Sequence, residues 1–141
     1  MNFLNIDPPS ILVVGDIMLD IQIQGIIEKI ANEAPIPVLH QQSEKKNLGG
    51  CGNVLMNLEA LGCDKIYLLS MIGDDHYGEE IQKIVDSYTN TSYKLLKRAD
   101  YCTTVKTRGF SDNKIIFRYD IEKKVTPWAE DIKNAISYLK I

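Results

Sequence analysis

Two carboxylates follow the first strongly apolar run of the sequence. Asp16 and Asp20 lie just beyond Ile11–Val14, a run that ends at Gly15. In open α/β sheets, ligands bind beyond the carboxyl ends of the strands. An ionised carboxylate only accepts hydrogen bonds and therefore suits a ligand rich in hydroxyls, such as a sugar. The alternative that the spacing leaves open is a polar loop in which either aspartate caps a turn.

A glycine-rich segment stands at the start of a helical pattern. Within Leu48–Asn53, Gly49 and Gly50 carry no side chain, so a ligand can approach their backbone and the free N–H groups of the helix start. Asn53 adds a donor and an acceptor. The segment matches neither the dinucleotide fingerprint nor the P-loop. Close packing of a helix onto a sheet explains the glycines equally well.

Three cations stand in two late apolar segments. Lys106 and Arg108 are two residues apart, as are Arg118 and Asp120, so each pair shares one face of its strand. Two cations on one face can hold a phosphate, the arginine as a bidentate fork and the lysine as a point charge. A solvated strand face with cross-strand ion pairs is the alternative.

The other reactive residue types lack partners in the sequence. His76 has a side chain that titrates near neutrality, but no partner for it is identifiable. The three cysteines form an odd set with no C-x-x-C pair, which disfavours a disulfide framework, and no zinc-ligand spacing joins them to the two histidines: Cys51, Cys63 and Cys102. We therefore expect no metal ligands and three reduced thiols, most of them buried.

Apolar periodicity predicts the elements that position these residues. Continuous runs predict buried strands at Ile11–Val14 and Lys65–Met71, and the alternation at Ile21–Gln24 predicts a strand with one wet face. Helices are expected at Gly50–Leu61 and at about Tyr77–Tyr88. The first helix would direct an apolar stripe to the core and end before Gly62: Val54, Leu55, Leu58 and Leu61.

The rest of the chain predicts further strands and one more helix. Extended segments are expected at Val38–Gln42, before the polar stretch Ser43–Asn47 and a sharp Gly49–Gly50 turn, and at Tyr93–Lys97, Thr103–Phe110 and Ile115–Tyr119, with a hairpin turn at Ser111–Asn113. Thr126 and Pro127 open a final helix with the apolar stripe Ile132, Ala135, Ile136 and Leu139. Strand and helix alternate early in the chain, which predicts a parallel sheet in an α/β fold.

Length and composition limit the class of protein. The 141 residues are 45% hydrophobic and 25% charged, with a formal net charge of −3, which is typical of one globular domain. No bulk positive charge favours a nucleic-acid or anionic-membrane partner. No apolar run approaches the roughly 20 residues that span a bilayer, and residues 1–10 do not resemble a secretory signal. We therefore expect a cytoplasmic protein.

Four segments, in this order and at these spacings, resemble a known family: Val13–Asp20, Glu33–Val38, Leu48–Gly62 and Ile72–Gly78. Together they are similar to the N-terminal part of a ribokinase-like (PfkB-type) carbohydrate kinase, and the resemblance covers nearly the whole chain. Glu33–Val38, Lys106–Arg108 and Arg118–Glu122 most resemble the heptose 7-phosphate kinase domain of the bifunctional kinase/adenylyltransferases of ADP-heptose synthesis.

The resemblance implies a fold and an activity. The expected fold is a partial α/β sandwich with a small β-sheet lid, cut after about its N-terminal half, with lid strands within about residues 21–42 and 101–120. The complete enzyme would use ATP and Mg²⁺ to phosphorylate D-glycero-D-manno-heptose 7-phosphate at its anomeric hydroxyl. The product, the 1,7-bisphosphate, would enter ADP-heptose and lipopolysaccharide core synthesis. The lid strands would also form a homodimer contact.

The same resemblance assigns substrate-binding roles by position. Asp20, in the loop after the first strand, would hold sugar hydroxyls, and Gly49, Gly50 and Asn53 would line that pocket. Asp16 is a weaker candidate for the same group. Lys106 and Arg108 are the candidates to meet the 7-phosphate. Cys51 and Gly52 stand where small residues, often alanines, are usual in the family.

The family's late Asp-Thr-x-Gly-Ala-Gly-Asp motif, which holds the catalytic base and the anion hole, does not occur in these residues. No catalytic residue is therefore assigned in this chain, and we expect it to have little or no kinase activity and no tight ATP or Mg²⁺ binding alone. Two alternatives stay open: a kinase fragment for another sugar or nucleoside, and a non-catalytic module that dimerises through its lid strands.

Overall fold

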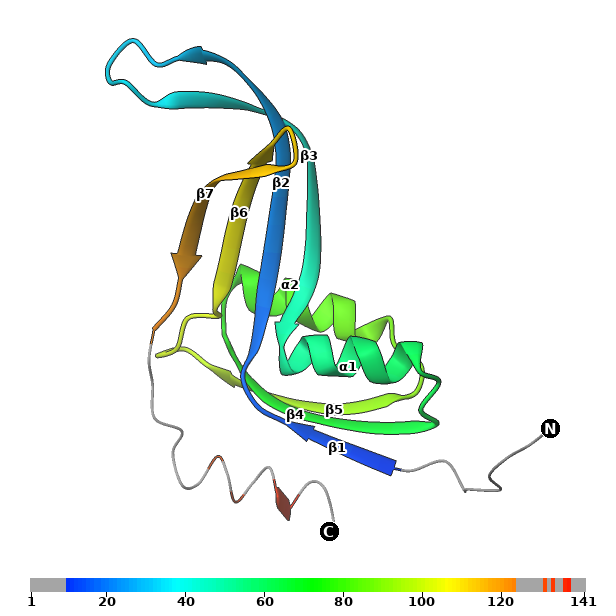
Figure 1. Cartoon of the computed structure of the whole chain (residues 1–141). Helices are drawn as coiled ribbons and strands as arrows, with labels where there is room; N and C mark the ends of the chain where they lie inside the picture. The colour runs from blue at the N-terminus through cyan, green and yellow to red at the C-terminus, as the bar shows by residue number, and fades with distance from the viewer. Residues whose placement is uncertain (1–9, 124–130, 132, 134–135, 138–141) are drawn as a thin grey trace, which may run out of the picture.

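The computed structural model describes residues 10–123 together with 131, 133, 136 and 137. Two sheets and two helices make up this part of the chain (Figure 1). The first sheet contains β1 (Ser10–Val14), β4 (Lys65–Gly73) and β5 (Thr91–Arg98). The second contains β3 (Pro37–Gly50), β2 (Ile17–Ile30), β6 (Val105–Ser111) and β7 (Lys114–Ile121). The helices are α1 (Cys51–Ala60) and α2 (His76–Asp86).

The first sheet is parallel, in the order β1-β4-β5, which confirms the predicted α/β architecture. Both helices lie on the same face of this sheet (Figure 1). Alternate residues of β4 are fully buried, including Ile66, Leu68 and Ile72, because they face the helices. They form one core with the buried helix residues Leu55 and Ile81. Burial of these aliphatic side chains is the main stabilising contribution in this layer.

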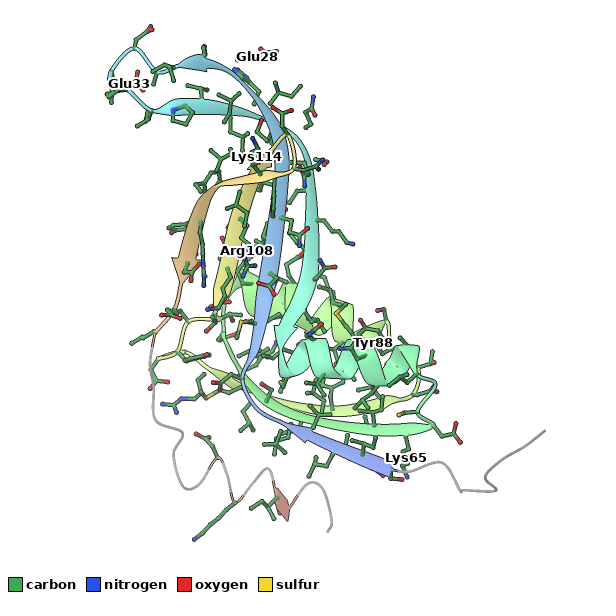
Figure 2. All side chains as sticks on the ribbon, in the orientation of Figure 1. Glu28, Glu33, Lys65, Tyr88, Arg108 and Lys114 are labelled. Atoms are coloured by element: carbon green, nitrogen blue, oxygen red, sulfur yellow. The ribbon has the colours of Figure 1, made fainter. Side chains whose placement is uncertain are left out.

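The second sheet stands away from the first, as its long strands rise from the helical layer (Figure 1). Its order is β3-β2-β6-β7, with β2 parallel to β6 and antiparallel to β3. At its base, Ile17 and Leu19 are fully buried in the common core. Arg108 lies partway along the sheet, and Glu33 lies at the far end of the β2–β3 hairpin (Figure 2).

Strand β3 differs from the sequence-based expectation. The polar stretch Ser43–Asn47 continues the strand, with Glu44 opposite Ile23 and Ser43 opposite Gln24 of β2. Backbone hydrogen bonds to β2 hold this segment extended whatever its side chains are. Its polarity reflects its position at the edge of the sheet, where charged side chains are typical.

The buried face of α1 is narrower than predicted. Leu55 is fully buried, whereas Val54 and Leu61, which were expected in the apolar stripe, are 49% and 80% exposed. Cys51 and Gly52 are buried as well. Gly52 lies so close to β3 that a Cβ added to it would come 2.6 Å from Cβ of Leu48. Val54 and Leu61 stand about two helical turns apart on one side of the predicted stripe, and this side faces solvent.

Two predicted turns are present. Asp112 and Asn113 both have positive φ, 48° and 61°, as the tight hairpin turn between β6 and β7 requires. Gly62 also has a positive φ, 75°, and its N–H donates to the carbonyl of Glu59 at the end of α1.

Most of the helix expected from Thr126 and Pro127 lies outside the described residues. Of its predicted stripe Ile132, Ala135, Ile136 and Leu139, the structure describes Ile136, which is helical but 55% exposed. No helix in the described part of the chain is long and apolar enough to cross a membrane.

Candidate functional site

The junction between β1 and β2 is fixed by β4 and α1. Ser70 of β4 donates its hydroxyl to the carbonyl of Gly15 at 2.6 Å and accepts the N–H of Ile17 at 3.0 Å. The N–H of Cys51, at the start of α1, donates to the carbonyl of Asp16 at 2.9 Å. These contacts hold the backbone at the point where the chain passes from the first sheet to the second.

The Cys51 thiol belongs to this junction. Burial raises the pKa of Cys51, so the thiol stays protonated near neutral pH, and it donates to the carbonyl of Gly15 at 3.2 Å. A buried, protonated thiol is a poor nucleophile. Cys51 therefore has a packing role. All three cysteines are free, as expected, but only Cys51 is buried, whereas Cys63 and Cys102 are partly exposed, so the expectation that most thiols are buried is wrong.

Asp20 lies in strand β2, not in the loop after β1 as expected. In the β2–β3 register Asp20 lies opposite Asn47 and diagonal to Gly49, where an added Cβ would come 2.5 Å from the Asp20 Oδ2 atom. Gly50 has φ 59° and ψ −131°, and a Cβ there would overlap the carbonyl oxygen of Asp16. The two glycines thus allow the end of β3 to pack closely against the junction. At Gly49, the backbone lies next to the Asp20 carboxylate with no side chain between them.

Two other predicted site residues, Asn53 and Asp16, are not joined to Asp20. Asn53 is an exposed residue in the first turn of α1, whose N-cap Gly50 offers no side-chain hydrogen bond. Asp16 is exposed in the bend before β2. Among the described residues, no hydrogen bond or ion pair links either side chain to Asp20. The structure brings Asp20, Gly49 and Arg108 together, whereas it leaves Asp16 and Asn53 as separate exposed groups.

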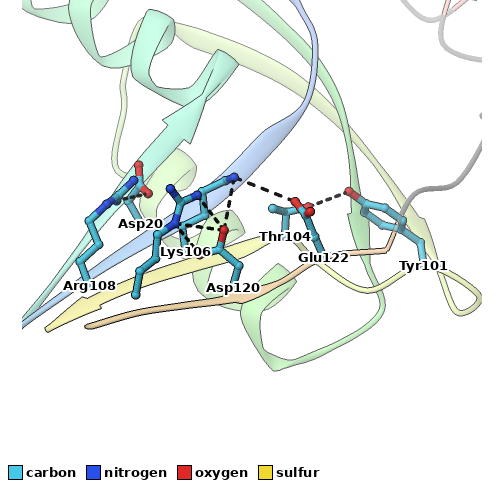
Figure 3. A network of polar contacts seen from close by, with 8 residues as sticks. Asp20, Tyr101, Thr104, Lys106, Arg108, Asp120 and Glu122 are labelled. Carbon is cyan, nitrogen blue, oxygen red and sulfur yellow. Dashed lines mark hydrogen bonds and ion pairs between the residues drawn. The ribbon is translucent and has the colours of Figure 1, made fainter. Parts of the chain in front are cut away.

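One face of the second sheet carries a network of charged side chains (Figure 3). Arg108 Nη1 donates to Asp20 Oδ1 at 2.9 Å. The Lys106 ammonium lies 3.8 Å from Asp120 and 4.0 Å from Glu122. Arg118 forms a bidentate contact with Asp120, with distances of 2.7 to 3.1 Å. The cross-strand ion pairs that the sequence left as an alternative are therefore present.

The electrostatics favour the ionised forms of Asp120 and Arg118. The hydrogen bond from Arg118 holds the pKa of Asp120 below its usual value, and the charges of Lys106 and Arg108 lower it further. The same hydrogen bond raises the pKa of Arg118. Partly exposed ion pairs contribute at most about 1 kcal/mol, so an incoming anion can replace a carboxylate at little cost. The network can therefore exchange partners with a charged ligand.

Asp75 has a role that the sequence reasoning missed. One carboxylate oxygen accepts the N–H of Gly78 at 2.8 Å, which caps α2, and the other accepts the N–H of Thr103 at 2.8 Å. The Thr103 hydroxyl in turn accepts the N–H of Gly73 at 2.9 Å. The residue thus ties α2 to the segment that leads into β6. An aspartate directly before a helix is a capping signal and could have revealed half of this role.

His76 is an exposed residue at the start of α2, and its ring is tilted against that of Tyr77 with 5.8 Å between centroids. No hydrogen bond or ion pair of its side chain occurs among the described residues. The position fits a surface histidine, in line with the absence of a partner in the sequence.

Comparison with known proteins places the chain in a family. Residues 8–136 match the family described as pfkB family carbohydrate kinase. The chain is 38% identical over 123 residues to "Bifunctional protein HldE" of Paramagnetospirillum magneticum, and 41% identical over 115 residues to the protein of that name from Helicobacter pylori. These alignments cover 87% and 82% of this chain but 25% of each relative, so the chain spans about a quarter of their length.

Solved structures show the same fold. A carbohydrate kinase from Agrobacterium tumefaciens superposes with a TM-score of 0.62 at 23% identity, covering 79% of this chain and 35% of that one. A nucleoside kinase of Methanocaldococcus jannaschii, described as an archaeal member of the ribokinase family, gives a TM-score of 0.57 at 20% identity over 79% and 36%. The fold is thus ribokinase-like, as predicted. The chain belongs to the pfkB family of carbohydrate kinases.

Proposed function

We propose that this chain forms the sugar-phosphate recognition part of an ATP-dependent kinase for D-glycero-D-manno-heptose 7-phosphate. The complete enzyme would phosphorylate the anomeric hydroxyl and supply the 1,7-bisphosphate for ADP-heptose and lipopolysaccharide core synthesis. Membership of the pfkB family and the relatives named "Bifunctional protein HldE" support this choice. The observation that carries it is the contact between Asp20 and Arg108 on one face of the sheet. This contact brings a carboxylate that could accept sugar hydroxyls next to a guanidinium that could bind a phosphate.

The residues divide by chemistry. The Asp20 carboxylate would accept hydrogen bonds from sugar hydroxyls beside the bare backbone of Gly49. Lys106 and Arg108 would bind the 7-phosphate, because a point charge and a bidentate fork together neutralise a dianion. Further substrate contacts would come from the positions around the junction: Asp16, Gly50 and Asn53.

The chain is assigned substrate binding and not proton transfer. ATP with Mg²⁺ would supply the γ-phosphoryl group in the complete enzyme. The described residues contain no group of three or more His, Cys, Asp or Glu side chains placed to hold a metal ion, so we assign no magnesium ligand among them. With no assigned base for the sugar hydroxyl, we expect little or no phosphoryl transfer from these 141 residues alone.

A kinase for an unphosphorylated sugar or a nucleoside is the alternative within the family. Such a substrate has no phosphate that could bind Lys106 and Arg108. The role of these two cations therefore distinguishes a kinase for a phosphorylated sugar from one for an unphosphorylated substrate. Replacement of both by alanine should abolish the preference for a phosphorylated sugar. Lys114→Ala is the matched control, because this lysine lies at the β6–β7 turn, away from the network (Figure 2).

A second function, self-association through the second sheet, has its own support. Four large apolar side chains of β7, at the edge of that sheet, are exposed to solvent: Ile115 at 61%, Ile116 at 37%, Phe117 at 39% and Tyr119 at 58%. Exposed apolar side chains on an edge strand favour pairing with another copy. We expect a homodimer in sedimentation experiments and a shift toward monomer for Phe117→Ser; a wild-type chain that stays monomeric at all concentrations would contradict this.

Calorimetric titration tests the substrate assignment. The chain is titrated separately with D-glycero-D-manno-heptose 7-phosphate, ribose, fructose 6-phosphate and ATP–Mg²⁺. We expect selective binding of the heptose phosphate, lost in the Lys106→Ala/Arg108→Ala variant and kept in Lys114→Ala. Binding of ribose or fructose 6-phosphate in preference to the heptose phosphate would contradict the assignment.

A further inference from the structure

Asp20 and Arg108, the two groups assigned to different parts of the substrate, are paired with each other. Asp20 Oδ1 accepts the hydrogen bond from Arg108 at 2.9 Å, while its Oδ2 lies against Gly49. Both side chains are only about a quarter exposed, 26% and 28%. Arg108 thus occupies Oδ1 of the carboxylate, so a sugar hydroxyl must compete with the guanidinium for that oxygen.

Arg108 also faces a second arginine across the sheet. In the β6–β7 register it lies directly opposite Arg118 on the same face. Like charges in this arrangement repel each other, and each guanidinium is balanced by its own carboxylate. Asp20 balances Arg108 (Figure 3), and Asp120 balances Arg118. A doubly charged anion near these forks would satisfy both cations better than single carboxylates do.

We propose that the Asp20–Arg108 ion pair is a latch that the substrate's own phosphate opens. The phosphate replaces Asp20 on Arg108, and the released carboxylate then accepts a hydroxyl of the same sugar. This inference rests on the proposed function, because it uses the same residues. It adds a source of selectivity: a sugar without phosphate must break the ion pair and gains no replacement for it.

The latch predicts that phosphate and sugar bind cooperatively even when they are separate molecules. A partly exposed ion pair of this kind corresponds to about a three- to fivefold effect on affinity. By linkage, phosphate on Arg108 tightens sugar binding by the same factor that sugar tightens phosphate binding. Without a latch, Arg108 would keep Asp20 while its remaining N–H groups bind the phosphate, and the two ligands would bind independently.

The test divides the substrate into two pieces. Phosphate-free D-glycero-D-manno-heptose is titrated into the chain with and without inorganic phosphate, at an ionic strength matched with chloride. We expect phosphate to tighten sugar binding about three- to fivefold. Independent binding, or competition between the two, would overturn the latch. Failure of the intact heptose 7-phosphate to bind, measured alongside, would instead overturn the proposed function and the latch with it.

Two variants separate the latch from simple phosphate binding. Arg108→Met removes the latch, so it should bind the phosphate-free sugar about three- to fivefold more tightly than the wild type, while heptose 7-phosphate binds at least about tenfold more weakly. Arg118→Met is the matched control, because it removes a cation of the same face but leaves Asp20 paired. It should weaken heptose 7-phosphate without any gain for the phosphate-free sugar.

The opposite pattern would contradict the inference. If Arg108→Met loses affinity for both sugars to the same extent, or if Arg118→Met gains affinity for the phosphate-free sugar, Arg108 does not restrain Asp20. Circular dichroism of each variant shows whether its fold is kept. Arg108→Lys provides a second measurement, because it keeps the charge but loses the fork, and it should retain part of the phosphate effect.

Discussion

Replacing Asp75 by asparagine should remove one of its two backbone hydrogen bonds and keep the one that caps α2. Its two oxygens each accept one backbone N–H, from Gly78 and from Thr103, both at 2.8 Å. Burial alone would raise the pKa of Asp75, but the hydrogen bonds from Thr103 and Gly78 outweigh burial and lower it. In Asp75→Asn the amide keeps one acceptor, and its NH₂ group must face the other N–H.

The expected loss follows from these contacts. Asparagine caps helices as well as aspartate does, so the bond to Gly78 is the one that the variant retains. A hydrogen bond to a charged group contributes about 1.5 to 3 kcal/mol, so Asp75→Asn should lower the free energy of unfolding by about 2 to 3 kcal/mol at pH 7. Because the folded-state pKa is lowered, this stabilisation is present above the unfolded pKa of about 4 and disappears as pH falls through the folded value.

Urea unfolding followed by circular dichroism measures this difference. The wild type and Asp75→Asn are compared at pH 7 and at steps down to about pH 3, and the gap between them should narrow below about pH 4. Asp74→Asn is the matched control, since Asp74 is exposed and its side chain makes no hydrogen bond or ion pair among the described residues, while its backbone N–H donates to the carbonyl of Arg98. Equal stability of Asp75→Asn and wild type at pH 7, or a gap that does not change with pH, would refute the reasoning.

Two further predictions concern backbone geometry and a surface ion pair. Gly50→Ala should destabilise the fold by more than about 3 kcal/mol, because its φ of 59° adds strain to an overlap with a carbonyl; Gly62→Ala, at φ 75° with open space around it, should cost about 1 to 2 kcal/mol in the same urea assay. Hydrogen bonds from Lys83 and Lys46 lower the pKa of Glu80 to about 2. An NMR titration should find this low pKa in the wild type and a higher pKa in Lys46→Met. An ordinary pKa of Glu80 in the wild type would contradict the observed contacts.

Local patterns in the sequence predict most of the first sheet and its helices. The run Ile11–Val14 and the spacing of Leu55 and Leu58 depend only on neighbours within a few residues, and β1 and α1 form where these patterns lie. The Asp112–Asn113 turn is of the same kind, because both residues tolerate positive φ. These elements need no distant partner to be recognised.

The second sheet depends on pairings that the sequence does not display. Ser43–Asn47 is a strand because β2 lies beside it, and no local propensity marks it as one. Asp20 and Arg108 are 88 positions apart, and they meet only because β2 and β6 are parallel in a particular register. The shared faces of Lys106 and Arg108 could be predicted from spacing, whereas their carboxylate partners could not.

The site is tested most directly by NMR, by mapping which backbone and arginine side-chain signals shift when D-glycero-D-manno-heptose 7-phosphate is added. We expect the largest shifts at Asp20 and Gly49, at Lys106 and at the Arg108 guanidinium, with inorganic phosphate alone shifting the two cationic residues and Asp20, the partner that it displaces from Arg108. Shifts confined to α2 or to β5, with the charged face of the second sheet unchanged, would contradict the assignment of this face to sugar-phosphate binding.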